Sequence, residues 1–127
     1  MNIIISNSGD TPIYEQISSQ IKEKIMTGRL KPGDALPSMR LLAKELRISV
    51  ITTKRAYEEL ERDGFIVTMT GRGSFVSENN AEKVRNEYLK RIKGYIEEAV
   101  RLSSICGISE EDLSKMISLI WEENKYE

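Results

Sequence analysis

The sequence predicts a mainly α (α+β) fold, on three observations. Two helical apolar patterns follow each other closely over residues 38–63, and two β-prone runs flank a glycine-rich loop within residues 65–76. After residue 80, apolar side chains recur every three or four positions, which indicates long amphipathic helices. We therefore expect two parts, residues 1–77 and residues 78–127.

Length and composition limit the class of protein. The chain has 127 residues, enough for one ordinary domain or a small domain with an appendage. It is 39% hydrophobic and 31% charged, typical of a soluble globular protein, and no apolar run approaches the roughly 20 residues of a membrane helix. No basic segment followed by an apolar one opens the chain, so we expect a cytoplasmic protein without a membrane partner.

The residue inventory argues against catalysis. Histidine is absent and Cys106 is the single cysteine, so an internal disulfide, a Cys/His metal cluster and histidine acid–base chemistry are excluded. We expect no enzymatic activity, no cofactor and no metal. Cys106 is expected to be a small apolar residue at an interface, with a redox-sensing thiol as the alternative.

The charge is unevenly distributed, although the formal net charge is only −1. Residues 1–77 carry eleven basic and nine acidic side chains, whereas the remainder carries eight and eleven. Within residues 38–57 a single acid, Glu45, accompanies five basic residues: Arg40, Lys44, Arg47, Lys54 and Arg55. Such local positive charge indicates an anionic partner more clearly than the total does.

The first part reads as three helices and a hairpin. Thr11-Pro12 is expected to start a helix that buries an isoleucine stripe and ends at Gly28. Ser38 and Ser49 are expected to cap two further helices, the latter running to about Asp63 with Gly64 as its stop. Two short helices so close together match a helix-turn-helix, and the β-hairpin that follows them would be its wing.

The tail is expected to form a homodimer. Its two apolar stripes cannot cover each other fully, so a symmetric partner is expected to bury them. The alternative is packing of the tail against the winged helix. The residues expected at the dimer interface share the helical spacing of these stripes: Tyr88, Ile92, Tyr95, Ile96, Ala99, Leu102, Met116, Ile120 and Trp121.

The start of the third helix carries the candidate DNA-binding residues. A helix that enters the major groove exposes its first two turns to base edges and phosphates. Those turns hold Ser49, Val50, Ile51, Thr52, Lys54 and Arg55, with Ser38 and Arg40 at the flank. In the hairpin loop, Gly71 and Arg72 suit close approach to a minor groove. The alternatives are an ordinary core helix with a solvated basic face and a glycine that serves the turn alone.

The order of motifs resembles the winged-helix domain of the GntR family over roughly residues 10–77. The matching segments are Leu36–Ala43, Ser49, Thr52, Arg55–Tyr57, Leu60, Gly64–Ile66 and Gly71–Val76. The sequence at 55–61 and the two-helix tail are similar to the YtrA-like subfamily. This resemblance implies a bacterial transcription regulator that binds its operator through Arg40, Ser49, Thr52, Lys54, Gly71 and Arg72.

Two departures from the family pattern concern specificity. Val50 stands where many members have arginine, and Lys54 stands where arginine is frequent, which replaces a bidentate fork with a point charge. A different operator sequence is therefore expected.

The expected function is that of a homodimeric repressor that recognises an inverted-repeat operator in double-stranded DNA. Two alternatives stay open at this point. A winged helix can be a protein-interaction module, which would favour acidic or apolar groups in place of Arg40, Lys54 and Arg72. An unknown small-molecule effector could also bind between the tail helices.

Overall fold

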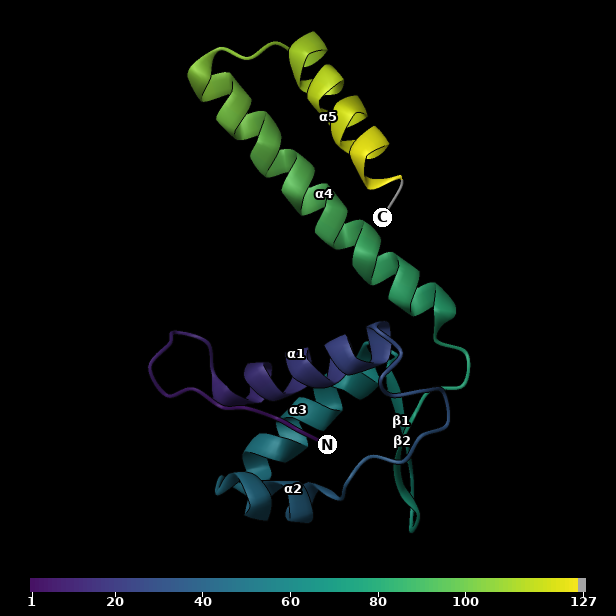
Figure 1. The fold of residues 1–127 in the computed structure, drawn as a ribbon. Coiled ribbons are helices and arrows are strands. Elements are labelled where there is room, and N and C mark those ends of the chain that lie inside the picture. Colours follow the sequence, from purple (N-terminus) through teal and green to yellow (C-terminus); the bar gives the residue numbers. More distant parts are fainter. Residues whose placement is uncertain (126–127) are drawn as a thin grey trace. The chain divides into compact units, whose positions relative to one another are not determined.

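The computed structural model describes residues 1–125, and the chain divides into two compact units, Met1–Asn86 and Glu87–Glu127. The first unit contains α1 (Ile13–Met26), α2 (Met39–Leu46), α3 (Val50–Arg62), β1 (Ile66–Met69) and β2 (Gly73–Val76), followed by the beginning of α4. The rest of α4 (Ala81–Cys106) and α5 (Glu110–Asn124) form the second unit. The mainly helical winged helix-turn-helix with a β-hairpin is confirmed (Figure 1).

The core of the first unit forms around α3, against which α1, α2 and β1 all pack. The isoleucine stripe of α1 is buried, as its spacing predicts, and meets Leu42 of α2 and Tyr57 of α3. The largest fully buried side chains are Tyr57, Phe65, Ile17, Ile21, Leu42, Leu60, Ile66 and Val76. This core fixes which side of α3 faces inward and leaves the opposite side exposed.

Helix starts follow the sequence at two of the three predicted positions in the first unit. Ser38 Oγ accepts the Leu41 N–H at 3.1 Å, and Ser49 Oγ accepts the Ile51 N–H at 3.1 Å. The Thr11 cap is wrong: Pro12 is the N-cap residue of α1, and no side-chain cap bond forms there. Proline lacks a side-chain acceptor, so that end of α1 keeps its first N–H groups without such a partner.

The N-terminal segment is more than a lead-in, because two glutamines of α1 bind its backbone. Gln20 Oε1 accepts the Ile4 N–H at 2.9 Å, and its Nε2 donates to the Ile4 carbonyl at 2.6 Å. Gln16 forms the same pair of bonds with Ser6, at 2.8 Å each. One turn of an α-helix and two residues of extended chain have similar lengths. The side-chain amides of Gln16 and Gln20, one turn apart on α1, therefore reach Ser6 and Ile4, which are two residues apart. Ile3 thereby enters the core.

The hairpin is antiparallel, with a register running from Ile66↔Val76 to Met69↔Gly73. Met69 and Gly73 belong to the strands, whereas Phe65 precedes β1 and is buried. The wing tip is therefore only the three residues between the strands.

The second unit is a helical hairpin of α4 and α5 (Figure 1). Gly107, with φ of 78°, follows α4, and Ser109 Oγ accepts the Asp112 N–H at 3.1 Å at the start of α5. Both features agree with the sequence pattern. None of the helices within residues 1–125 has the length and apolar character required to cross a membrane.

Candidate nucleic-acid interface

Buried hydrogen bonds from α3 hold the start of α2 in place. Thr53 is fully buried, and its Oγ1 donates to the Met39 carbonyl at 3.1 Å or the Val50 carbonyl at 2.9 Å. One turn further on, the Tyr57 hydroxyl donates to the Pro37 carbonyl at 2.8 Å. Burial of Tyr57 raises the pKa of its hydroxyl, so it remains a donor. The segment that carries Ser38 and Arg40 is thus fixed to α3.

The same segment also holds the wing. The Leu36 N–H donates to the Ser74 carbonyl at 2.9 Å, and the Gly33 N–H donates to the Val76 carbonyl at 2.9 Å. In return, the Val76 N–H donates to the Asp34 carbonyl at 2.8 Å. Residues 33–38 therefore tie β2 on one side to α2 and α3 on the other. In Figure 1, α2 and the wing tip lie on the same, lower side of this unit.

The exposed side of α3 begins with apolar side chains. Val50 is 43% exposed and Ile51 78% exposed, while Lys54 and Arg55 lie exposed one turn later. Thr52 is half-buried. β-Branched apolar side chains in water at a helix start suit contact with thymine methyl groups in a major groove.

The two capping serines retain a hydrogen-bond donor. Ser38 and Ser49 each use the hydroxyl oxygen to accept a backbone N–H, so the hydroxyl hydrogen stays available for an incoming acceptor. Both sit where the helix dipole favours negative charge. A phosphate oxygen is the acceptor that fits both conditions.

The candidate cations differ in their surroundings. Lys54 Nζ lies 3.9 Å from Glu58 Oε1, with the two side chains 64% and 63% exposed, so water and salt weaken this pair. Arg40 and Arg72 are exposed, and neither forms an ion pair with a carboxylate of residues 1–125. Among the candidate cations of the predicted site, these two arginines are therefore the most available to an external anion.

Arg55 lies at the α1 edge of α3 rather than in the middle of its exposed side. Its guanidinium carbon is 3.8 Å from the centre of the Tyr14 ring, a cation–π arrangement between α3 and α1. Tyr14 was not among the residues expected at the site. This contact holds the Arg55 guanidinium at the side of α3. If α3 lay in a DNA groove, that side would face the wall of the groove rather than a base edge.

The wing tip and the first residue of β2 allow close approach of the backbone. Gly71 and Gly73 have φ of 80° and 105°, and no atom lies within 4 Å of the position that a Cβ would take at either. Arg72, between them, donates its backbone N–H to the Met69 carbonyl at 2.9 Å, so its side chain is carried on a closed turn. A single arginine on such a tip suits a narrow minor groove.

The tail residues expected at a dimer interface are largely exposed in the single chain. Tyr95 and Trp121 are 74% and 73% exposed, Ala99 is half-buried, and the others are 38–54% exposed. Six further apolar side chains that the expectation omitted are also exposed: Leu89, Val100, Ile105, Ile108, Ile117 and Leu119. Cys106 is exposed as well.

No group of three or more metal-ligating side chains occurs within residues 1–125. The clustered features are cations, hydroxyl donors and exposed apolar groups on a winged helix, which define a DNA-binding regulator.

Comparison with known proteins agrees with that class. The family model "Bacterial regulatory proteins, gntR family" matches residues 13–76. The HTH-type transcriptional repressor YtrA of Bacillus subtilis is 39% identical over 118 residues, which is 93% of this chain and 91% of YtrA.

Two solved structures are similar over nearly their whole length. A transcriptional regulator from Oenococcus oeni has a TM-score of 0.80 and 29% identity, covering 92% of this chain and 97% of its own. YtrA from Sulfolobus acidocaldarius, a GntR-family transcription factor, has a TM-score of 0.59 and 37% identity, covering 95% and 97%. The chain belongs to the GntR family and is a DNA-binding transcriptional regulator, not an enzyme. The predicted YtrA-like resemblance is confirmed.

Proposed function

We propose that this regulator is a cytoplasmic repressor that binds an inverted-repeat operator as a homodimer. The observation that carries the proposal is the position of Arg40 and Arg72, exposed and without carboxylate partners in residues 1–125, on the scaffold that also presents the start of α3. Similarity to a protein named as a repressor supports the direction of regulation.

In the proposed complex, α3 enters the major groove at its first turns. Val50 and Ile51 contact thymine methyl groups, and Lys54 exchanges Glu58 for a guanine edge or a phosphate. Ser38, Ser49 and Thr52 donate to phosphate oxygens, as do Arg40 and Arg55 with their guanidinium groups. Gly71 and Arg72 approach the adjacent minor groove.

The exposed apolar faces of α4 and α5 support the homodimer. α5 has no buried residue, and Ser103 is the single buried residue of α4 in the described chain. A hollow of about 500 Å³ on α5, lined by Ile117, Ile120 and Trp121 among others, leaves room for side chains of a partner copy. A two-fold dimer would present two copies of α3 to half-sites about one helical turn, or a multiple of it, apart.

Salt-dependent DNA binding tests the proposal. We would titrate a 40-base-pair duplex from immediately upstream of the protein's own gene by fluorescence anisotropy, comparing wild type with Arg40→Ala and Arg72→Ala. If each arginine contacts one phosphate per protomer, each variant lowers the slope of log affinity against log salt by about 1.8 for a dimer. Arg62→Ala, at the far end of α3, is the matched control and should bind as wild type.

The outcomes are distinct. Weaker, less salt-dependent binding by both variants, with unchanged circular dichroism, supports the site. Wild-type affinity in both variants would overturn it. Light scattering on the eluting protein should give roughly twice the 14.5 kDa chain mass, and a monomer at all concentrations would overturn the homodimer.

A further inference from the structure

Arg47, in the turn between α2 and α3, has a backbone conformation that favours glycine. Its φ and ψ are 57° and 49°, in the left-handed region. Within residues 1–125 it is the one residue other than glycine with a positive φ. A side chain in this conformation crowds its own backbone, so an arginine here destabilises the turn relative to glycine.

The hydrogen bonds around Arg47 define a standard helix ending. The Arg47 N–H donates to the Lys44 carbonyl at 3.3 Å, and the Ile48 N–H reaches back to the Ala43 carbonyl at 3.0 Å. This pair of bonds is the Schellman motif, in which the left-handed position is usually glycine.

The same chain uses glycine where it repeats this motif. After α3, Gly64 has φ of 83°, and the Phe65 N–H donates to the Leu60 carbonyl at 3.0 Å. After α4, Gly107 has φ of 78°, and the next N–H donates to the Ser103 carbonyl at 2.9 Å. α1 is also followed by a left-handed glycine, Gly28. Among the first four helices, α2 alone is followed by a side chain in this conformation.

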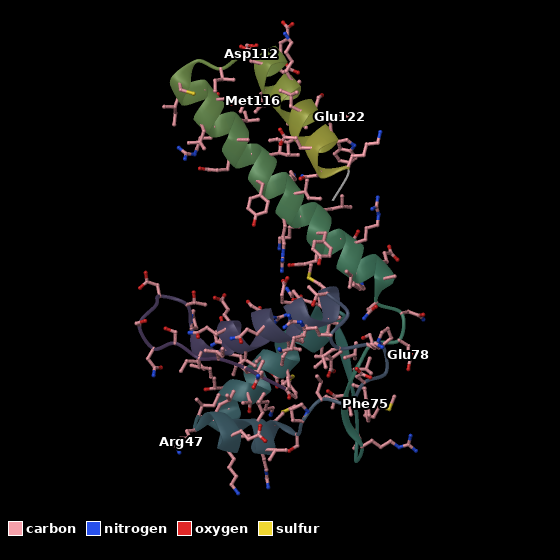
Figure 2. All side chains as sticks on the ribbon, viewed as in Figure 1. Arg47, Phe75, Glu78, Asp112, Met116 and Glu122 are labelled. Carbon is pink, nitrogen blue, oxygen red and sulfur yellow. The ribbon has the colours of Figure 1, made fainter. Side chains whose placement is uncertain are left out.

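No interaction within the described chain accounts for the arginine. The Arg47 side chain is exposed and forms no hydrogen bond, ion pair or ring contact with residues 1–125. Figure 2 labels it at the outer edge of the first unit, beside α2. Its cost to the turn is thus not offset by any such contact within residues 1–125.

The position of Arg47 relative to α3 indicates what it binds. Arg47 precedes Ser49, the N-cap of α3, by two residues, which limits the distance between their Cα atoms to about 7 Å. A helix that enters the major groove by its first turn brings the residues just before it to the rim of the groove, where the phosphates lie. The guanidinium group suits a phosphate, which it can bind with two parallel hydrogen bonds.

We propose that Arg47 is a DNA-contacting residue that binds a backbone phosphate at the rim of the groove entered by α3. The inference rests on the proposed function and adds a residue that neither the motif pattern nor the capping analysis identified. Because a phosphate contact carries no base information, Arg47 strengthens binding to operator and random DNA alike.

Replacement with glycine separates this role from a structural one. Arg47→Gly is expected to raise Tm by about 3 °C, because the strain of the left-handed side chain is removed. The same variant should bind DNA up to about sixty-fold more weakly at 0.1 M salt, and the salt slope should fall by about 1.8, if a dimer loses two phosphate contacts. Greater stability combined with weaker binding is not expected from a residue that only shapes the turn.

Three further variants complete the experiment. Arg47→Ala keeps a strained side chain but removes the charge, so it should lose affinity without the rise in Tm. Arg47→Lys keeps a charge and should retain most of the affinity. Arg62→Ala removes an exposed arginine from the other end of α3 and should match wild type. Each protein is titrated with the 40-base-pair upstream duplex and with a random-sequence duplex of equal length.

The results distinguish the two levels of the proposal. If the wild-type protein binds DNA and both Arg47→Gly and Arg47→Ala bind it more weakly, the phosphate contact is supported. If the wild-type protein binds DNA and both variants bind with the same affinity, the role of Arg47 is overturned and the proposed function stands. If wild-type protein binds neither duplex at low salt, the proposed function fails, and the role of Arg47 fails with it.

Discussion

Replacing Tyr57 with phenylalanine tests the bond that fixes the start of α2 to α3. Tyr57 is 1% exposed, and its hydroxyl donates to the Pro37 carbonyl at 2.8 Å. The variant keeps the ring in the core but leaves that carbonyl without its donor. The expected loss is about 1–2 kcal/mol in the free energy of unfolding at pH 8. For a chain of this length it corresponds to a Tm lower by about 4–8 °C.

The size of this difference depends on pH. Burial raises the pKa of Tyr57 above its usual value of about 10. Above pH 10 the unfolded chain releases this proton while the folded chain retains it, so wild-type stability falls by up to about 1.4 kcal/mol per pH unit. Tyr57→Phe lacks the titrating group, and every other group is shared. The difference in free energy of unfolding between wild type and Tyr57→Phe should therefore disappear near pH 11.

Urea unfolding followed by circular dichroism at pH 8, 10 and 11 measures the gap. Tyr95→Phe, at an exposed tyrosine, is the matched control and should show little difference from wild type at pH 8. Equal stability of wild type and Tyr57→Phe at pH 8 would refute the stabilising role of the hydroxyl. A difference in stability between the two proteins that persists unchanged to pH 11 would refute the raised pKa of Tyr57.

Two other predictions concern the tail and α3. Ile96 of α4 is 50% exposed in the single chain, and Ile96→Glu places a charge there, so light scattering should report a mass near 14.5 kDa instead of twice that value. An unchanged dimer would exclude Ile96 from the interface. Glu58→Ala removes the carboxylate 3.9 Å from Lys54 and should tighten binding to the upstream duplex several-fold in anisotropy, with stability changed by less than about 0.5 kcal/mol. Weaker binding by Glu58→Ala would contradict the placement of Lys54 at the DNA.

Features that depend on neighbouring residues were predictable from sequence. Ser38 and Ser49 cap their helices because a hydroxyl just before an apolar helical pattern can accept a free N–H of the first helical turn. Gly28 and Gly64 follow their helices in the left-handed conformation for similarly local reasons. The hairpin followed from two β-prone runs around glycines, and only its bounds shifted by a residue.

Features that depend on tertiary contacts were not predictable. Tyr14 meets Arg55 because α1 crosses α3, and no spacing within either helix encodes that crossing. The left-handed conformation of Arg47 was not anticipated, because such a position is inferred from glycine, which is absent there. The pair between Lys54 and Glu58, by contrast, has the i,i+4 spacing of a helical ion pair and could have been anticipated.

Targeted cleavage tests most directly whether the wing and the start of α3 lie against a DNA duplex. Cys106 is the single cysteine, so Thr70→Cys in a Cys106→Ser background carries one iron–EDTA probe at the wing tip. Arg62→Cys in the same background carries it at the far end of α3. We predict two symmetric clusters of strand cleavage in the upstream duplex from position 70 and none from position 62. Equal cleavage from both positions, or cleavage from position 62 alone, would contradict the proposed interface.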